Sequence, residues 1–171
     1  MRFYLDTEFN GFGGELISIA LVTQFLRGAQ YTSYQIIKPS ADRILDPWVA
    51  DNVIPHLRVE STDQGHEVTP DEAGARLAAI FAEYGHVEIY ADWPADFEHL
   101  CALLARHGKN MGFSYCPNMT FRLVPTPDLT FWRSGTQHNA LDDAMTLQRW
   151  NECQLEALAD MCGLEGEDRP I

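Results

Sequence analysis

Acidic side chains with regular spacing mark the start of the sequence. Asp6 and Glu8 stand two residues apart, beside the apolar residues Phe3 and Leu5. Because side chains alternate between the two faces of a strand, both carboxylates point to the same face of a sheet. Unpaired charges in a buried strand are costly unless something compensates for them, and a metal ion is the simplest compensation. The pair therefore predicts a cation site.

Two further groups of titratable residues follow, each where a helix is predicted to begin. Asp92 and Asp96 lie just after the apolar run 87–91, in the kind of strand-to-helix turn where α/β proteins usually bind ligands. Asp96 also has a structural interpretation, as an acid that complements the positive end of the helix. His138 and Asp143 lie in the third group, at the start of the last helical segment.

The spacing of His138 and Asp143 constrains where the last helix begins. If both lay within it, five steps of roughly 100° would set them about 140° apart, too far round to act together. We therefore expect His138 to precede the helix. With Asn139 as N-cap, Asp142 takes the third helical position and a capping role, while Asp143 turns toward another face. Asp142 thus has a structural reason to be acidic, and Asp143 lacks one.

The order of these residues resembles the three motifs of the DEDD exonuclease superfamily, histidine subclass. The matching residues are Asp6-x-Glu8, then Asp96, then His138 followed after four residues by Asp143. The resemblance spans residue 4 to about residue 150. It implies an α/β fold of the ribonuclease-H-like (exonuclease) type, with a mixed five-stranded sheet flanked by helices.

The segments 4–9 and 15–19 and the helix around Asp96 are similar to the small stand-alone exoribonuclease AS family. This resemblance implies a metal-dependent 3′-5′ exoribonuclease that releases nucleoside 5′-monophosphates from single-stranded RNA 3′ ends or 3′ overhangs. It also implies two divalent metal ions, Mg²⁺ or Mn²⁺, since carboxylates suit both. The residues carried over are the metal ligands Asp6, Glu8, Asp96 and Asp143 and the general base His138. Asp92 fits the family pattern less well.

Substrate contacts are harder to predict from the sequence than the acids. We expect them from Thr7, Phe9, Trp132 and Arg133, because aromatic faces stack on bases and guanidinium groups meet phosphates. Further candidates of the same types are Phe12, Phe131 and Arg122. A DNA-directed exonuclease with the same site is an alternative, since the acids do not contact the 2′-hydroxyl. A catalytically silent nucleic-acid-binding relative is a second alternative, which the complete set of catalytic residues disfavours.

The hydrophobic pattern supplies the elements that must position these residues. Strands are predicted at 2–6, 16–23, 31–37 and 87–91, with another near 129–132. Helices are predicted at 46–57, 69–85, 95–107 and 139–162, the second opening with a capping box of Thr69 and Glu72. Residues 60–68 read as a polar loop, and 109–136 as a loop-rich stretch. A buried strand flanked by helices predicts an α/β protein.

Length and composition set the outer limits. A chain of 171 residues, 46% of them hydrophobic, predicts a single domain over 1–171. No apolar run is long enough for a membrane helix and no secretory signal opens the sequence, so we expect a cytoplasmic protein without membrane contact. By analogy with stand-alone relatives we also expect a homodimer. The net charge of −13 disfavours nucleic-acid binding. Bound divalent cations would reverse the field that a phosphate meets at the acids.

Overall fold

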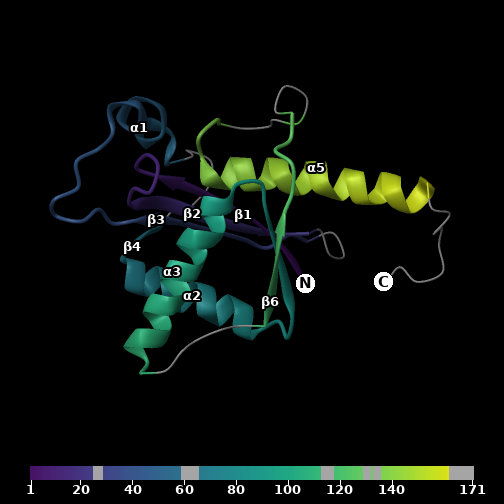
Figure 1. Cartoon of the computed structure of the whole chain (residues 1–171), viewed down its shortest axis with the longest axis horizontal. Helices are drawn as coiled ribbons and strands as arrows, with labels where there is room; N and C mark the ends of the chain where they lie inside the picture. Colours follow the sequence, from purple (N-terminus) through teal and green to yellow (C-terminus); the bar gives the residue numbers. More distant parts are fainter. Residues whose placement is uncertain (25–28, 59–65, 113–117, 129–131, 133–135, 162–171) are drawn as a thin grey trace.

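A mixed β-sheet with helices on both faces forms the framework of the molecule, seen in the computed structural model of Figure 1. The structure describes residues 1–24, 29–58, 66–112, 118–128, 132 and 136–161. The sheet has six strands in the order β4-β3-β2-β1-β5-β6. The α/β class predicted from the sequence is therefore confirmed.

The first three strands form the predicted antiparallel meander. They are β1 (Arg2–Phe9), β2 (Leu16–Thr23) and β3 (Thr32–Ile37). β1 runs three residues further than the sequence predicts and so carries Thr7, Glu8 and Phe9 within the sheet. On its other side β1 pairs in parallel with β5 (Val87–Ala91), which in turn pairs in parallel with β6 (Met119–Leu123).

The prediction of five strands is wrong, because the sheet has six. β4 (His66–Val68) lies in the segment predicted as a polar loop and pairs in parallel with β3. Its three residues HEV carry no clear apolar alternation, so only backbone pairing to a neighbour makes them a strand. β6 lies within residues 109–136, which the sequence predicts to be rich in loops. The strand predicted near 129–132 falls largely outside the described residues.

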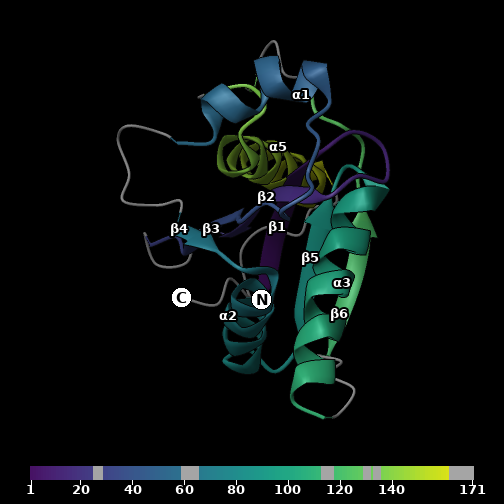
Figure 2. The ribbon, with the colours of Figure 1, turned by 90° about the vertical axis from the view of Figure 1, so that its left-hand side faces the viewer.

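The helices cover the two faces of the sheet (Figure 2). α5 (Ala140–Met161) packs on β1 and β2, whereas α2 (Pro70–Ala82) and α3 (Pro94–Asn110) pack against each other and cover the opposite face. The predicted capping box at the start of α2 is confirmed, since Thr69 and Glu72 each accept a hydrogen bond from the other's backbone N–H. The short helix α1 (Pro47–Asn52) continues into a 3₁₀ turn, η1 (Ile54–His56).

Side chains of β1 alternate between two buried cores, and this alternation positions the acids. Phe3 and Leu5 pack in the core beneath α2 and α3, while Tyr4 packs in the core beneath α5. By the same alternation Asp6 and Glu8 lie on the α5 side of the sheet. Within the described ranges, no helix is both long and apolar enough to span a membrane.

Candidate metal centre

The first group of acids joins β1 to the start of α5. Asp6, Glu8 and Asp143 each offer a carboxylate oxygen, and these atoms all lie within 4.8 Å of one another. Asp6 and Glu8 share a face of β1 because they stand two residues apart. Asp143 reaches them because α5 packs on β1 along that face.

A second group shares Asp6 with the first. Carboxylate oxygens of Asp6, Asp92 and Asp96 also lie within 4.8 Å of one another. The parallel register explains part of this arrangement. Tyr4 pairs with Tyr90, so two residues further on Asp6 lies level with Asp92, just beyond the end of β5. Asp92, which fits the family pattern less well, therefore stands with the four predicted ligands.

Asp96 is held in place from one side and left unsatisfied on the other. Its side chain is buried in the first turn of α3. Its Oδ1 accepts a hydrogen bond from the Thr7 hydroxyl at 2.6 Å, while its buried Oδ2 has no hydrogen-bond partner among the described residues. A buried carboxylate oxygen without a partner is costly, and a coordinated cation is one partner that would satisfy it. The donor set thus fits a hard divalent cation, which prefers oxygen ligands.

Burial and mutual repulsion shift the titration of the cluster upward. Burial, followed by the neighbouring carboxylates of Asp96, Asp143 and Glu8, raises the pKa of Asp6 well above its usual value. Burial, followed by Asp143 and Asp96, raises the pKa of Glu8 to about 8.

Asp92 and Asp96 shift in the same direction. Burial raises the pKa of Asp96 to about 7, against a lowering by the hydrogen bond from Thr7, and burial also raises the pKa of Asp92. In the described parts of the chain, no Lys or Arg forms an ion pair with Asp6, Glu8, Asp92 or Asp96. The part of the chain that the structure describes therefore gathers carboxyl groups here without supplying these four acids with a cation.

Asn139 sets the start of α5. This fully buried side chain accepts hydrogen bonds from the backbone N–H groups of Leu141 at 3.0 Å and Asp142 at 3.3 Å, so its predicted role as N-cap is confirmed. Its amide nitrogen donates to the His56 carbonyl at 2.6 Å, which ties the helix start to η1. Asp142 accepts a hydrogen bond from the backbone N–H of Thr136 at 2.6 Å. Asp142 stands at the predicted third helical position and has a structural role, but its side chain bonds the loop before the helix at Thr136, and the capping bonds go to Asn139.

His138 precedes α5, as predicted, and has a left-handed backbone with φ of 60°. This conformation is uncommon for residues other than glycine, although His adopts it more readily than most. The His138 ring packs edge-on against Trp48 of α1, with ring centroids 4.9 Å apart. His138 lines two adjoining cavities, and Asp6 and Asp143 line both of them as well.

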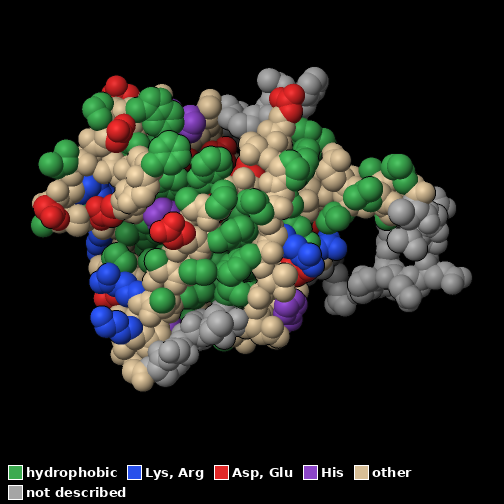
Figure 3. Space-filling view, in the orientation of Figure 1, with side chains coloured by type: hydrophobic (Ala, Val, Ile, Leu, Met, Phe, Trp, Pro, Cys, Tyr) green, Lys and Arg blue, Asp and Glu red, His purple; other side chains and the backbone are tan. Residues whose placement is uncertain are grey.

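Aromatic side chains surround the acids in the larger cavity, which has a volume of about 690 Å³. Phe9, Phe12, Trp48 and Trp93 line it, and Phe12 is 90% exposed. Figure 3 shows acidic side chains recessed among hydrophobic ones near the starts of α3 and α5. A cavity of this size is typical of small-molecule and cofactor sites.

Sequence reasoning missed Trp48 and Trp93. Trp93 directly follows Asp92 in the strand-to-helix turn, so its position beside an acid was a usable signal. Trp48 had no such signal, because it reaches the cavity only through the packing of α1, whose Val49 clusters with Ile17 of β2.

The predicted substrate contacts divide into three cases. Thr7 and Phe9 line the cavity, although the Thr7 hydroxyl is engaged with Asp96. Trp132 is half-buried and is not among the described residues that line the cavity, and Arg133 lies outside the described residues. Arg122 of β6 pairs with Glu88 of β5 and is not among the described residues that line the cavity.

No protein-family model matches the chain, and no curated protein matches it. The features that bear on function are therefore the positions of the acids and the lining of the cavity.

Proposed function

We propose that this protein is a metal-dependent 3′-5′ exoribonuclease, and that its α/β framework is of the ribonuclease-H-like type. The observation that carries the proposal is the pair of acidic groups that share Asp6 at the floor of an aromatic-lined cavity. Two groups with a shared ligand suit two cations, an arrangement that nucleases and other phosphoryl-transfer enzymes use. The order of the motif residues along the chain supports the same assignment.

Five carboxylates would hold the cations. Asp6 belongs to both groups, Glu8 and Asp143 complete one, and Asp92 and Asp96 complete the other. When bound, a pair of Mg²⁺ or Mn²⁺ ions activates a water molecule and stabilises the departing 3′-oxygen of the RNA. Thr7 orients the Asp96 carboxylate through its hydrogen bond, so its contribution is to position a ligand.

His138 serves as the general base. It lines both cavities beside Asp6 and Asp143, and its ring packs against Trp48 in a fixed orientation. An imidazole accepts a proton near neutral pH, because its usual pKa is about 6.5. His138 takes a proton from the attacking water, whose oxygen forms a bond to phosphorus as the bond between phosphorus and the 3′-oxygen of the preceding nucleotide breaks. That 3′-oxygen takes up a proton from solvent, and the terminal nucleotide leaves as a nucleoside 5′-monophosphate.

The aromatic side chains that line the cavity hold the terminal nucleotides. Phe9 and Phe12 come from the end of β1 and the loop after it, Trp48 comes from α1, and Trp93 precedes α3. Every base has a face that stacks on an aromatic ring, at about 1 to 3 kcal/mol per base. This mode of binding suits a single-stranded 3′ end of any sequence.

A degradation assay on matched oligonucleotides tests the proposal. RNA labelled at its 5′ end, and DNA of the same sequence, are incubated with Mg²⁺, Mn²⁺ or EDTA. We expect stepwise shortening of the RNA from its 3′ end, release of nucleoside 5′-monophosphates, and no reaction in EDTA. Equal or faster shortening of the DNA would support a DNA-directed exonuclease with the same site. Binding of RNA without shortening in either metal would support a silent nucleic-acid-binding protein instead.

A further inference from the structure

A second groove lies directly beside the cavity that holds the acids. It has a volume of about 530 Å³ and runs along α3, with Gly14 and Leu16 on one side and Arg106 and Lys109 on the other. Nothing in the proposed hydrolysis uses this groove. Its position and its charge indicate what it binds.

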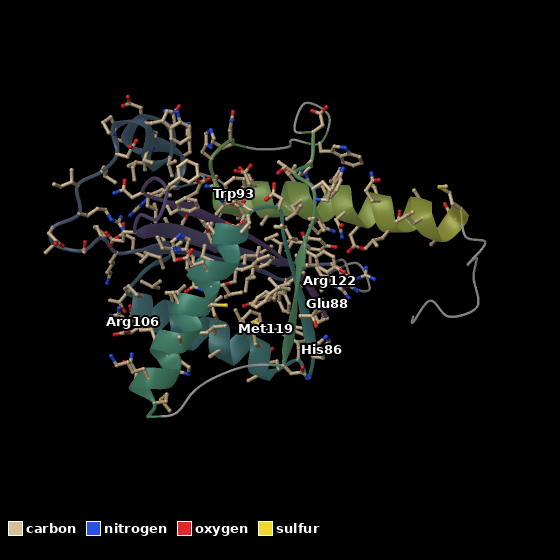
Figure 4. All side chains as sticks on the ribbon, in the orientation of Figure 1. His86, Glu88, Trp93, Arg106, Met119 and Arg122 are labelled. Atoms are coloured by element: carbon tan, nitrogen blue, oxygen red, sulfur yellow. The ribbon has the colours of Figure 1, made fainter. Side chains whose placement is uncertain are left out.

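The groove continues the path of the acidic cavity. Phe9 lines the cavity and His99 lines the groove, and their two rings lie against each other with centroids 5.0 Å apart. The loop between β1 and β2 borders both, through Phe12 on one side and Gly14 on the other. α3 also borders both, since Trp93 stands at its start and Arg106 lies near its far end (Figure 4).

The groove is basic in a chain whose net charge is −13. Lys and Arg side chains gather beside the lower half of α3 in Figure 3, on the side where Figure 4 labels Arg106. Arg106 is 55% exposed and forms an exposed ion pair with Asp71 of α2, and exposed pairs of this kind contribute little. Lys109 is exposed and forms no ion pair with the residues that the structure describes.

Glu15, the acid in the groove lining, already has hydrogen-bond partners within the protein. Glu15 accepts hydrogen bonds from Arg43 Nε at 2.8 Å and from the Ser40 backbone N–H at 2.9 Å. Its charge is thereby offset. Of the two cations in the lining, Lys109 forms no ion pair with the described residues and Arg106 forms an exposed one with Asp71, so an anionic ligand can still meet both.

We propose that this groove binds the RNA strand upstream of its 3′-terminal nucleotides, with Arg106 and Lys109 contacting its phosphates. The proposal rests on the proposed exoribonuclease function. At 1.5 Å per helical residue, Arg106 and Lys109 lie about 15 and 20 Å along α3 from Asp96. At about 3.4 Å of axis per phosphate in a stacked strand, this distance spans about four to six nucleotides. Short RNAs reach only the acidic cavity, whereas longer ones also reach the groove.

Binding and hydrolysis are measured on the double variant Arg106→Gln, Lys109→Gln. Fluorescence anisotropy in Ca²⁺, with the RNA verified as intact afterwards, gives Kd for a strand of roughly ten nucleotides, longer than the path requires. We expect Kd to rise roughly three- to tenfold. The slope of log K against log salt should fall by about 1.4, since each phosphate contact on a single strand contributes about 0.7. Hydrolysis of a dinucleotide should keep its kcat and KM.

Arg122→Gln is the matched control, because Arg122 is also 55% exposed and also pairs with an acid, Glu88. Figure 4 shows Arg122 beside β6, on the other side of α3 from Arg106. An unchanged Kd and salt slope in the double variant, or an equal change in Arg122→Gln, would overturn the groove proposal. Failure of the wild-type protein to hydrolyse either RNA would instead overturn the exoribonuclease function. Thermal melting of all variants separates lost binding from lost folding.

Discussion

Glu8 and Glu15 stand on either side of the same short connection between β1 and β2, yet their surroundings are opposite. Glu15 accepts hydrogen bonds from Arg43 and Ser40, and the bond from Arg43 is the largest cause that lowers its pKa to about 2. Glu8 is half-buried, and after burial its strongest influences are the carboxylates of Asp143 and Asp96, which raise its pKa to about 8.

The difference separates two uses of an acidic side chain. At Glu15 the chain supplies the cation itself, so the carboxylate fastens the loop to the segment around Arg43. Around Glu8 the nearby partners in the described structure are other acids, and the balance of charge must come from outside the chain. Substitution should therefore damage function at one site and stability at the other. Five predictions test this contrast.

The largest effect is expected from Asp6→Ala, because Asp6 belongs to both acidic groups. Loss of this ligand should lower the rate of RNA hydrolysis by more than about a thousandfold. In EDTA the melting temperature should stay the same or rise, since one of several repelling carboxylates is gone. An assay of metal-dependent hydrolysis checks the expected loss of rate, and thermal melting in EDTA checks the expected stability. Full activity in the variant would contradict the ligand role.

Asp143→Ala and Asp142→Ala compare two adjacent acids with different partners. Asp143 belongs to the acidic group with Asp6 and Glu8, so under the proposed function its loss should lower turnover by a hundredfold or more. Asp142 accepts a hydrogen bond from the Thr136 backbone, so its loss should cost about 1 kcal/mol of stability and leave turnover intact. Steady-state rates and denaturant melts of both variants show which acid serves turnover and which serves stability. If Asp142 proved to be the essential acid, the assignment at the start of α5 would be wrong by one residue.

His138→Ala should lower the rate of the chemical step by roughly a hundredfold, the usual scale for a positioned general base. Metal affinity and RNA affinity should change little, because the carboxylates remain. The matched control is His86→Ala, since His86 is exposed and bonds to Asn118 at the opposite end of β5. Single-turnover rates and metal titration check both variants. A His138 variant that fails only because metal no longer binds would show that His138 is structural.

Much of this arrangement could be predicted from the sequence. Alternation and spacing are local properties, so they gave the bounds of β2 and β5, the capping box of α2 and the N-cap at Asn139. Asp6, Glu8, Asp96 and Asp143 were identified because their order along the chain is distinctive, and the structure brings them together around Asp6.

The parts that could not be predicted depend on contacts between distant segments. β4 is a strand only because β3 lies beside it, and its three residues have no pattern of their own. Asp92 joins the acids through the parallel register of β1 and β5, which sequence spacing does not reveal. Trp48 meets His138 through the packing of α1 and η1 against the start of α5.

The pH dependence of stability tests the contrast without a nuclease assay. A carboxyl group whose folded pKa is raised binds more protons folded than unfolded, so it lowers stability as pH rises above its unfolded pKa. For Glu8 this window runs from its usual pKa of 4.5 to its raised pKa of about 8, and above that the effect levels off. In EDTA the melting temperature should therefore fall by several degrees between pH 5 and pH 8. Added Mn²⁺ should restore it most at pH 8, and Glu8→Gln should flatten the profile. A metal-free melting temperature that rises over this range would contradict the crowding of charge at the site.

The smallest effect is expected from Glu15→Ala, which tests the other side of the comparison. This change leaves the buried Arg43, whose side chain is 7% exposed, without its carboxylate, although Arg43 keeps its hydrogen bond to the Leu16 carbonyl. Because Glu15 itself is one third exposed and water replaces part of the lost interaction, we expect a loss of about 1 kcal/mol, or roughly 2 to 4 °C in melting temperature. The wild type should be more stable than the variant at neutral pH. This difference should shrink as pH falls toward 2, because Glu15 becomes protonated in the wild type. Hydrolysis of a dinucleotide per folded molecule should be unchanged, because Glu15 lines the groove and not the acidic cavity. A Glu15 variant with full stability but no dinucleotide hydrolysis would mean that the paired acid, too, serves the reaction.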